Sequence, residues 1–600
     1  MKKILDLITE KMESAFAGCG YDASYAKVVL SNRPDLCEYQ CNGAMAAAKA
    51  YKKKPIDIAG QVVEQLKEQC RQAEGQHQTP VFLDEDMSAV MPGFINLKVN
   101  PQFVADYMNE MEKAPKLGLE ETGHGETVIV DYGGANVAKP LHVGHLRSAV
   151  IGECIRRLGN FLGYHMIGDV HLGDWGLQMG LIIEELRDRK PELVYFDETY
   201  TGEYPEEPPF TISELEDIYP AASGKAKADE AFKERAQTAT FQLQNGCAPY
   251  RAIWKHIMSV SLADLKKNYG NLDVHFDLWK GESDAQPYIP GLIQDLQDKG
   301  LAYESQGALV VDIAQPGDSK ELPPCIVRKS DGAALYATSD LGTIIEREKD
   351  FAPVKYIYIT DKRQELHFTQ VFRVAKKAGY VKPETEMIHI GFGTMNGRDG
   401  KPFKTRDGGV MRLENLIADI NEAVYGRIME NRTVSEDEAR TTAQIVGLAA
   451  LKYGDLSNQA SKDYVFDLDR FISFEGNTGP YILYTIVRIK SILSRYKEQG
   501  GKEEEGTILS PSCDSEKTLM LYLARYNEVV TAAFEETAPH KLCQYIFELS
   551  NAFNSFYHDN RILAEEDKAR QASWIRLITL TKSVLETCIQ TLGFQSPERM

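Results

Sequence analysis

The most constraining feature of the sequence is a short apolar run that passes through two glycines into a long helical segment. The run Thr127-Val128-Ile129-Val130-Asp131-Tyr132 has the pattern of a buried strand, and Gly133-Gly134 follow it directly. Helical periodicity then extends from about His142 to Leu162. Because strand, glycine loop and helix in this order open the nucleotide-binding unit of α/β proteins, we expect a Rossmann-like domain here.

Three later apolar runs support the same fold class. They lie at Leu309–Asp312, Tyr356–Ile359 and Met387–Ile390, and helical stretches separate them. Strands that alternate with helices favour a doubly wound parallel sheet, so the fold class of the catalytic part is predicted to be α/β. The Pro-, Glu- and Tyr-rich stretch Asp197–Asp229 interrupts this pattern, and we interpret it as a surface excursion of low order.

Different patterns flank this α/β region. Residues 1–20 repeat apolar side chains four apart, Phe94–Val99 alternates like a strand, and Gly118–Gly125 resembles a linker, which predicts an N-terminal α+β added domain. The last part repeats apolar residues at helical spacing and predicts an all-α bundle, with a loop at Gln499–Glu516. With 600 residues the chain is too long for one core, and we divide it into residues 1–120, 121–395, 396–455 and 456–600.

Composition excludes some classes of function. The net charge of −20 argues against a protein that coats nucleic acid through bulk positive potential, although the first 100 residues, with 12 basic and 13 acidic side chains, are nearly neutral and compatible with a local RNA contact. No stretch approaches the roughly 20 apolar residues that a bilayer requires, and the N-terminus has no apolar signal core. We therefore expect a cytoplasmic protein without a membrane partner.

The ten cysteines predict no metal site. They form no C-x-x-C pair, and no Cys/His group has the spacing of a zinc site. Two close thiols, Cys37 and Cys41, are more often core residues than metal ligands. We interpret all ten as reduced and mostly buried thiols, and expect no metal in the protein itself and no protein-bound zinc.

The phosphate-binding residues are predicted between the first strand and its helix. The chain has no Walker A sequence, and the G-x-G near residue 391 lacks its third glycine. At the helix start, Pro140 fixes the backbone, His142 and His145 lie on one face, and Gly144 leaves room for an adenine ring. Without context, two histidines at this spacing are more often incidental surface residues. The candidate segment is Ala135-Asn136-Val137-Ala138-Lys139-Pro140-Leu141-His142-Val143-Gly144-His145.

Context changes that interpretation. Asp131–Gly152, together with the Gly-Asp-Val-His-Leu-Gly-Asp-Trp-Gly-Leu-Gln block at 168–178, resembles the class I aminoacyl-tRNA synthetases, with His142–His145 as their HIGH signature. The D-W-G-x-Q part narrows the resemblance to the arginyl-tRNA synthetase family. Phe474–Tyr481 and the end of the chain from Leu592 to Met600 extend it over nearly all 600 residues.

The resemblance implies roles for individual residues. Gly400–Arg406 takes the place of the second, degenerate signature, so that Lys404 and Arg406 would contact ATP phosphates, together with Lys139 before the first signature. Asp131 departs from family members that carry Glu there, and Gly133-Gly134 also departs from the usual pattern. Considered without the resemblance, Asp340 is more readily interpreted as a helix N-cap before Leu341, and Tyr336 as a core residue. The implied arginine-binding set is Asp131, Asn136, Tyr336, Asp340 and Gln370.

The implied reaction is arginine–tRNA ligation. L-Arginine and ATP, carried with Mg²⁺, would form arginyl-adenylate and pyrophosphate, and the arginyl group would then pass to the 3′ end of tRNA(Arg) without a covalent enzyme intermediate. By the same resemblance, the bundle contacts the anticodon, the N-terminal domain contacts the outer corner of the tRNA, and the enzyme is a monomer. The alternatives are a small-molecule nucleotidyltransferase and a catalytically silent tRNA-binding paralogue.

Overall fold

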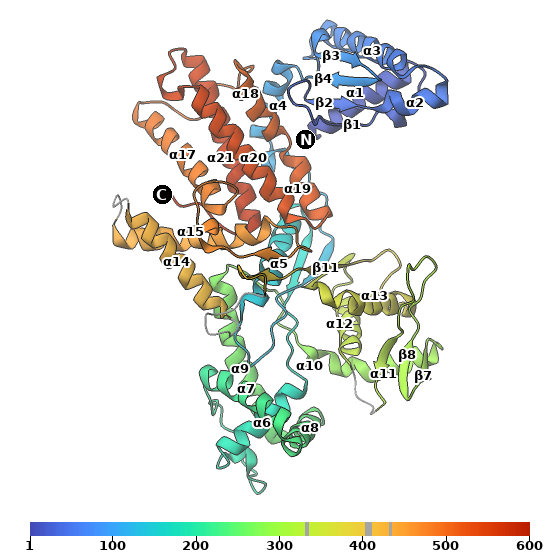
Figure 1. Cartoon of the computed structure of the whole chain (residues 1–600), viewed down its shortest axis with the longest axis vertical. Coiled ribbons are helices and arrows are strands. Elements are labelled where there is room, and N and C mark those ends of the chain that lie inside the picture. The colour runs from blue at the N-terminus through green and yellow to red at the C-terminus, as the bar shows by residue number, and fades with distance from the viewer. Residues whose placement is uncertain (331–334, 402–410, 431–434) are drawn as a thin grey trace.

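The computed structural model describes residues 1–330, 335–401, 411–430 and 435–600. The molecule is elongated, with a small N-terminal domain beside a large helical bundle, a central sheet beneath them, and two lobes at the other end (Figure 1). Within the described ranges, every helix is too short or too polar to cross a membrane.

The N-terminal domain is the predicted mixture of helices and strands. Its four strands pair in the order β1-β2-β4-β3, and all their pairings are antiparallel. The apolar face of α1 is buried against the core, as its four-residue spacing requires. The elements are α1 (Ile4–Gly18), β1 (Val28–Leu30), β2 (Tyr39–Cys41), α2 (Gly43–Tyr51), α3 (Pro55–Gly75), β3 (Met87–Val90), β4 (Phe94–Leu97) and α4 (Pro101–Lys113).

The central sheet is parallel, as predicted. Its order is β11-β10-β5-β6, formed by Glu386–Phe392, Lys355–Asp361, Thr127–Asp131 and His165–Asp169. The strand pattern had not indicated β6, because its five residues begin with an exposed histidine and include Gly168. Helix α5 (Val143–Phe161) follows β5 and lies along the sheet, while α12 (Tyr336–Asp350) and α13 (Glu365–Ala378) flank β10 in the sequence.

One predicted strand belongs to another sheet. The run Leu309–Asp312 does form β8 (Ala308–Val311), but β8 pairs antiparallel with β7 (Ala302–Ser305) and β9 (Cys325–Arg328) in a separate three-stranded sheet. Gln306 and Gly307, with φ of 51° and 80°, make a two-residue hairpin. Such a turn forces antiparallel pairing, whereas a parallel neighbour needs a long crossover. The assignment of this run to the parallel sheet was therefore wrong.

The second half of the stretch predicted to be of low order is helical. Helix α7 (Ile212–Ala228) occupies the second half of Asp197–Asp229, and Thr211 caps it with a hydrogen bond to the Glu214 backbone. Its buried side chains, Leu215, Ile218 and Ala222, recur at three- and four-residue intervals. Composition had obscured that period, so the prediction was wrong for this half. Helix α7 belongs to one of the two lobes, green in Figure 1, together with α6 (Leu177–Arg189), α8 (Glu230–Gln244) and α9 (Ala248–Asn271).

The last part of the chain is the predicted bundle of helices. Helix α17 ends at Glu498 and α18 begins at Asp514, so the expected loop at 499–516 is confirmed apart from its last three residues. Its helices are α16 (Leu468–Phe471), α17 (Gly479–Glu498), α18 (Asp514–Ala524), α19 (Tyr526–Glu535), α20 (Pro539–Asp559) and α21 (Lys568–Leu592). Two more helices, α14 (Leu413–Glu430) and α15 (Glu436–Leu456), precede them in the part predicted at residues 396–455.

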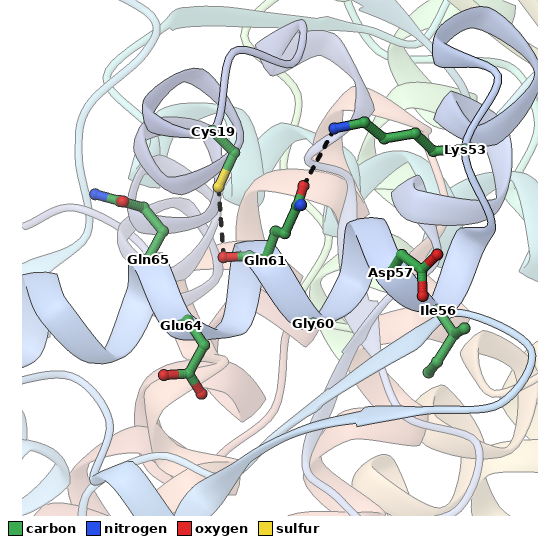
Figure 2. A pocket seen from close by; sticks show the side chains of 8 residues that line it. All are labelled: Cys19, Lys53, Ile56, Asp57, Gly60, Gln61, Glu64 and Gln65. Atoms are coloured by element: carbon green, nitrogen blue, oxygen red, sulfur yellow. Dashed lines mark hydrogen bonds between the residues drawn. The ribbon is translucent and has the colours of Figure 1, made fainter.

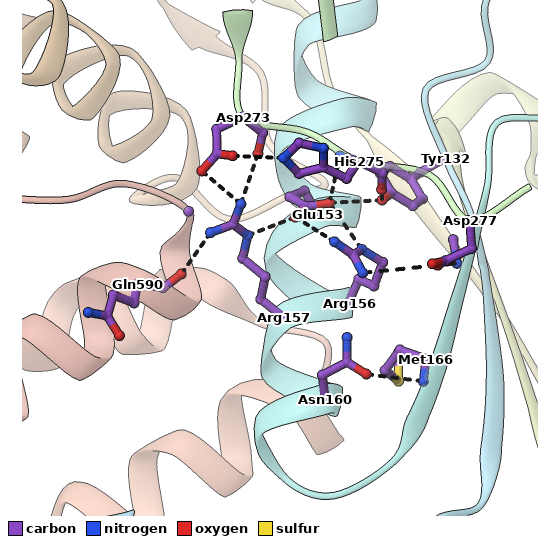
Figure 3. Close-up of polar contacts among 12 residues, drawn as sticks. Tyr132, Glu153, Arg156, Arg157, Asn160, Met166, Asp273, His275, Asp277 and Gln590 are labelled. Carbon is purple, nitrogen blue, oxygen red and sulfur yellow. Dashed lines mark hydrogen bonds and ion pairs between the residues drawn. The ribbon is translucent and has the colours of Figure 1, made fainter. Parts of the chain in front are cut away.

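A polar junction joins the central sheet to the bundle (Figure 3). The buried Glu153 carboxylate on α5 accepts hydrogen bonds from Arg156, Arg157 and the Tyr132 hydroxyl. Arg157 extends the network to the Asp273 carboxylate at 2.8 Å and to the carbonyl oxygen of Gln590 on α21 at 3.3 Å. The bundle is therefore linked, through Arg157 and Glu153, to Tyr132, which follows β5, the strand that carries the predicted site.

Candidate active site

The two histidines of the predicted signature meet at the start of α5. His142 is the N-cap, and its Nδ1 accepts a hydrogen bond from the Gly144 N–H at 3.0 Å. The Nδ1 of His145 accepts from the His142 N–H at 3.2 Å. Since each Nδ1 is an acceptor, each neutral ring carries its proton on Nε2. The two side chains thus present N–H donors at a helix N-terminus, where anions bind favourably.

Both imidazoles are held neutral. Burial lowers the pKa of His142, and the nearby Lys139 ammonium lowers it further. Burial also lowers the pKa of His145, to about 3, with a smaller contribution from His142. The ring centroids lie 4.0 Å apart. The pair therefore donates hydrogen bonds near pH 7 without carrying positive charge, and Lys139 supplies the cation.

The position of the His142 ring requires glycine at residue 144. A Cβ at this position would lie 2.7 Å from Cε1 and 2.8 Å from Nδ1 of His142, closer than carbon and nitrogen atoms normally approach. Any side chain here would displace the N-cap ring. The sequence prediction explained this glycine by space for an adenine ring, and the His142 contact adds a second reason.

Carboxylates end the two neighbouring strands β5 and β6. Arg347 of α12, which is 2% exposed, donates from Nη2 to Asp131 at 2.6 Å and to Asp169 at 2.7 Å. The ligand atoms of Asp131, Asp169 and His171 lie within 4.8 Å of one another, the one such group in the described residues that could hold a metal ion. The guanidinium already supplies its positive charge, so the contacts favour an internal ion pair over a metal site.

Asp340 is not a helix cap. Helix α12 begins at Tyr336 with Leu335 as its N-cap, so Asp340 projects from the second turn. One carboxylate oxygen lies 2.5 Å from His367 Nε2, and the other lies 4.0 Å from His171 Nε2. His171 has a φ of 26°, and neither ring nitrogen has a hydrogen-bond partner among the described residues. The alternative interpretation of Asp340 as a cap was therefore wrong.

A second acidic residue, which the sequence did not reveal, lies close enough to His171 and Asp340 to interact with them electrostatically. Burial raises the pKa of Glu282, the first residue of α10 (Glu282–Ala285), to about 7; His171 opposes this rise, and Asp174 and Asp340 increase it. Asp174 fixes the turn by accepting from Ser283 N at 3.0 Å and Ser283 Oγ at 2.6 Å. We call Asp340 and Glu282, with His171 beside them, the acidic cluster.

The other predicted residues differ in their surroundings. Tyr336 is 71% exposed at the start of α12, so its alternative interpretation as a core residue was wrong. Asn136 pairs with Gly173 through a backbone bridge, which brings the signature segment beside the 168–178 block. The Gln370 amide donates to the carbonyl oxygens of Pro323 and Pro324, both at 3.1 Å. Lys404 and Arg406 lie outside the described residues.

A separate hollow lies on the N-terminal domain, between α1 and α3 (Figure 2). Cys19 Sγ donates to the Gln61 carbonyl oxygen at 3.4 Å, and Lys53 Nζ lies 3.5 Å from Gln61 Oε1. Acidic, basic and apolar side chains are mixed here, without a cluster of like charge or convergent donors. The hollow lacks the features of the site at α5.

Comparison with known proteins identifies the family. The model for "tRNA synthetases class I (R), catalytic domain" matches residues 110–468, "Arginyl tRNA synthetase N terminal domain" matches 2–99, and "DALR anticodon binding domain" matches 482–600. The chain is 58% identical to "Arginine--tRNA ligase" of Agathobacter rectalis over 609 residues, with all of both chains covered. It belongs to the arginyl-tRNA synthetase family. A second arginine–tRNA ligase, from Alkaliphilus oremlandii, is 54% identical over 600 residues and is also fully covered.

Solved structures support the fold of this synthetase. Arginyl-tRNA synthetase from Plasmodium falciparum superposes with a TM-score of 0.82 at 24% identity, with 100% of each chain covered. The Thermus thermophilus arginyl-tRNA synthetase gives a TM-score of 0.76 at 21% identity and covers 99% of this chain and 100% of its own. The predicted fold class, an α/β catalytic domain with an N-terminal α+β domain and a C-terminal helical domain, is confirmed.

Proposed function

We propose that this synthetase activates L-arginine with ATP and transfers the arginyl group to the 3′ end of tRNA(Arg), with release of pyrophosphate and AMP. The observations that carry the proposal are the paired Nε2 donors of His142 and His145 at the start of α5 and the grouping of two carboxylates, Asp340 and Glu282, around His171. An arginine side chain and a nucleoside triphosphate need these two chemistries next to each other.

The acidic cluster would select the substrate. A guanidinium has five donors in a planar fork and loses much affinity if it is buried unpaired, so two carboxylates are a suitable counterpart. We assign this pairing to Asp340 and Glu282, with the Tyr336 hydroxyl nearby. Contacts of Asn136 and Gln370 with the amino-acid head group remain predictions. So does a substrate contact of Asp131, whose Oδ2 is already engaged by Arg347.

The helix start would stabilise the phosphates. The arginine carboxylate attacks the α-phosphorus in line, and negative charge grows on the phosphate oxygens as pyrophosphate leaves. His142 and His145 then donate through Nε2, while Lys139, with Lys404 and Arg406, supplies positive charge. Mg²⁺ travels with ATP and neutralises phosphate charge. The protein itself provides positioning and electrostatic stabilisation and forms no covalent intermediate.

The remaining assignments follow from the family. We propose the four-part division at residues 120, 395 and 455, with the anticodon read by residues 456–600 and the outer corner of the tRNA contacted by residues 1–120. We also propose a monomer that acts in the cytoplasm. Light scattering of the purified chain and of its tRNA complex tests the monomer.

Arginine-dependent ATP–pyrophosphate exchange tests the function. The assay is run with and without tRNA(Arg), and with lysine and glutamine in place of arginine. Exchange that requires both arginine and tRNA(Arg) would support the proposal. If tRNA binds but no mixture supports exchange, the chain is a silent tRNA-binding paralogue. Exchange with an unrelated carboxylate and no tRNA would indicate a small-molecule nucleotidyltransferase.

Replacing His145 with Asn separates its two roles. The Asn oxygen can still accept from the His142 N–H and keep the helix start, but the Nε2 donor is lost. We expect kcat to fall about 100-fold, the usual cost of one transition-state donor. His165→Asn, at an exposed position on β6, is the matched control and should keep full exchange activity. A loss below threefold in His145→Asn would contradict the role given to this imidazole.

The raised pKa of Glu282 predicts a pH dependence. Only the ionised carboxylate pairs with a guanidinium, so kcat/KM for arginine should fall about tenfold per pH unit as the pH drops below about 7. At saturating arginine the rate, which then reports kcat, should not show this fall. Glu282→Gln should make kcat/KM for arginine independent of pH in this range and lower than in the unsubstituted enzyme. Exchange assays between pH 5.5 and 8.5 measure the profile. If kcat/KM for arginine does not change with pH in the unsubstituted enzyme, Glu282 does not pair with the substrate guanidinium.

A further inference from the structure

Helix α7 brings an aromatic ring to the lysine of the signature segment. The Lys139 Nζ lies 4.6 Å from the centre of the Tyr219 ring, within the distance of a cation–π contact. Within the described ranges, Lys139 forms no ion pair with a carboxylate. The ring is therefore the contact that orients this ammonium, and it comes from a segment about 80 residues farther along the chain.

The same helix is anchored beside the signature a second time. Glu216, one turn before Tyr219, pairs with Arg412 at 2.6 Å, and its side chain is 11% exposed. Arg412 forms a backbone bridge with His142, and the Leu413 N–H donates to the Leu141 carbonyl oxygen at 3.0 Å. Helix α7 is thus linked, through the Glu216–Arg412 ion pair, to the segment that pairs with the backbone of His142 at the start of α5. Its position relative to Lys139 is set by an ion pair as well as by packing.

We propose that Tyr219 is a positioning residue for ATP: its ring holds the Lys139 ammonium beside the imidazoles of His142 and His145. Lys139 lies three residues before His142 in the chain, and its charge lowers the pKa of both histidines. A flexible four-carbon side chain would otherwise sample many rotamers, and ATP binding would have to restrict them. The ring reduces that cost before the phosphates arrive. This inference rests on the proposed function.

Three substitutions in the full-length chain test the inference. Tyr219→Leu keeps apolar volume but removes the ring, and we expect kcat/KM for ATP to fall about fivefold. Tyr219→Phe keeps the ring and should stay within about twofold of the unsubstituted enzyme. Tyr200→Leu, the same replacement elsewhere in this insertion, is the control and should leave the ATP dependence unchanged. The assay is tRNA-dependent pyrophosphate exchange at varied ATP.

A double substitution distinguishes positioning from structure. If Tyr219 acts through Lys139, Tyr219→Leu should cause no further loss of kcat/KM for ATP in a Lys139→Ala background. The inference is overturned if Tyr219→Leu lowers kcat/KM for ATP as much in the Lys139→Ala background as in the unsubstituted enzyme. It is also overturned if Tyr219→Phe lowers kcat/KM for ATP as much as Tyr219→Leu does, or if neither substitution changes kcat/KM for ATP. Absence of exchange in the unsubstituted enzyme would instead contradict the proposed function.

Discussion

Asp340→Asn is expected to lower kcat/KM for arginine about 1,000-fold. Asn has the same shape and can still accept from His367, whose Nε2 lies 2.5 Å from the Asp340 carboxylate, so the local structure should persist. The substrate guanidinium, however, would lose one of the two carboxylates proposed to pair with it in the acidic cluster. Removing one partner of such a pair costs about 3–5 kcal/mol, and 1.4 kcal/mol is a factor of ten.

The measurement is pyrophosphate exchange at varied arginine, with ATP and tRNA(Arg) at saturation. Asp350→Asn, at the exposed end of the same helix α12, is the matched control and should behave like the unsubstituted chain. KM for ATP should change little in Asp340→Asn, because the proposed phosphate site lies at the start of α5. If arginine kinetics change by less than tenfold, Asp340 serves mainly to orient His367 and the substrate pairs elsewhere.

Arg347→Met is expected to destabilise the catalytic domain by about 3–5 kcal/mol. Arg347 is 2% exposed and donates to carboxylates that end two adjacent strands, Asp131 and Asp169. Met fills much of the volume but leaves two buried carboxylates facing each other without a cation. The strand ends that present the site would then repel, and activity should fall together with stability.

The loss of stability caused by Arg347→Met should become smaller as the pH falls. Burial already raises the pKa of Asp131, and without Arg347 the two acids can relieve their repulsion by taking up a proton. Because the folded variant then binds more protons than its unfolded chain, its stability should rise relative to the unsubstituted enzyme as the pH falls from 8 to 5.5.

Urea unfolding followed by tryptophan fluorescence measures this effect, since Trp175, Trp254 and Trp279 all lie within the sequence of the catalytic region. Arg363→Met, at a residue whose side chain is 81% exposed and paired with Asp361, is the surface control and should cost less than about 1 kcal/mol. Equal urea midpoints for Arg347→Met and the unsubstituted chain would show that the buried pair contributes nothing to stability.

Local patterns predicted much of this molecule. The apolar run at 127–132, the glycine loop and the helix from 142 appear where their periodicity indicated, because strand, turn and helix start each depend on neighbouring residues. The pattern also predicted a strand at 309–312, but not its sheet, which depends on the hairpin at Gln306-Gly307. Low apolar content hid the regular period of α7.

The sequence by itself determined the family, the α/β fold class and the histidine pair, since these depend on residues close together in the chain. Only the tertiary structure decided which distant side chains meet in the catalytic region. Arg347 meets Asp131 across 216 residues, Glu282 reaches the space beside Asp340, and Tyr219 reaches Lys139 from an insertion. Contacts of this kind depend on how helices pack against the sheet. Local hydrophobic periodicity therefore does not predict which distant side chain forms an ion pair or a cation–π contact.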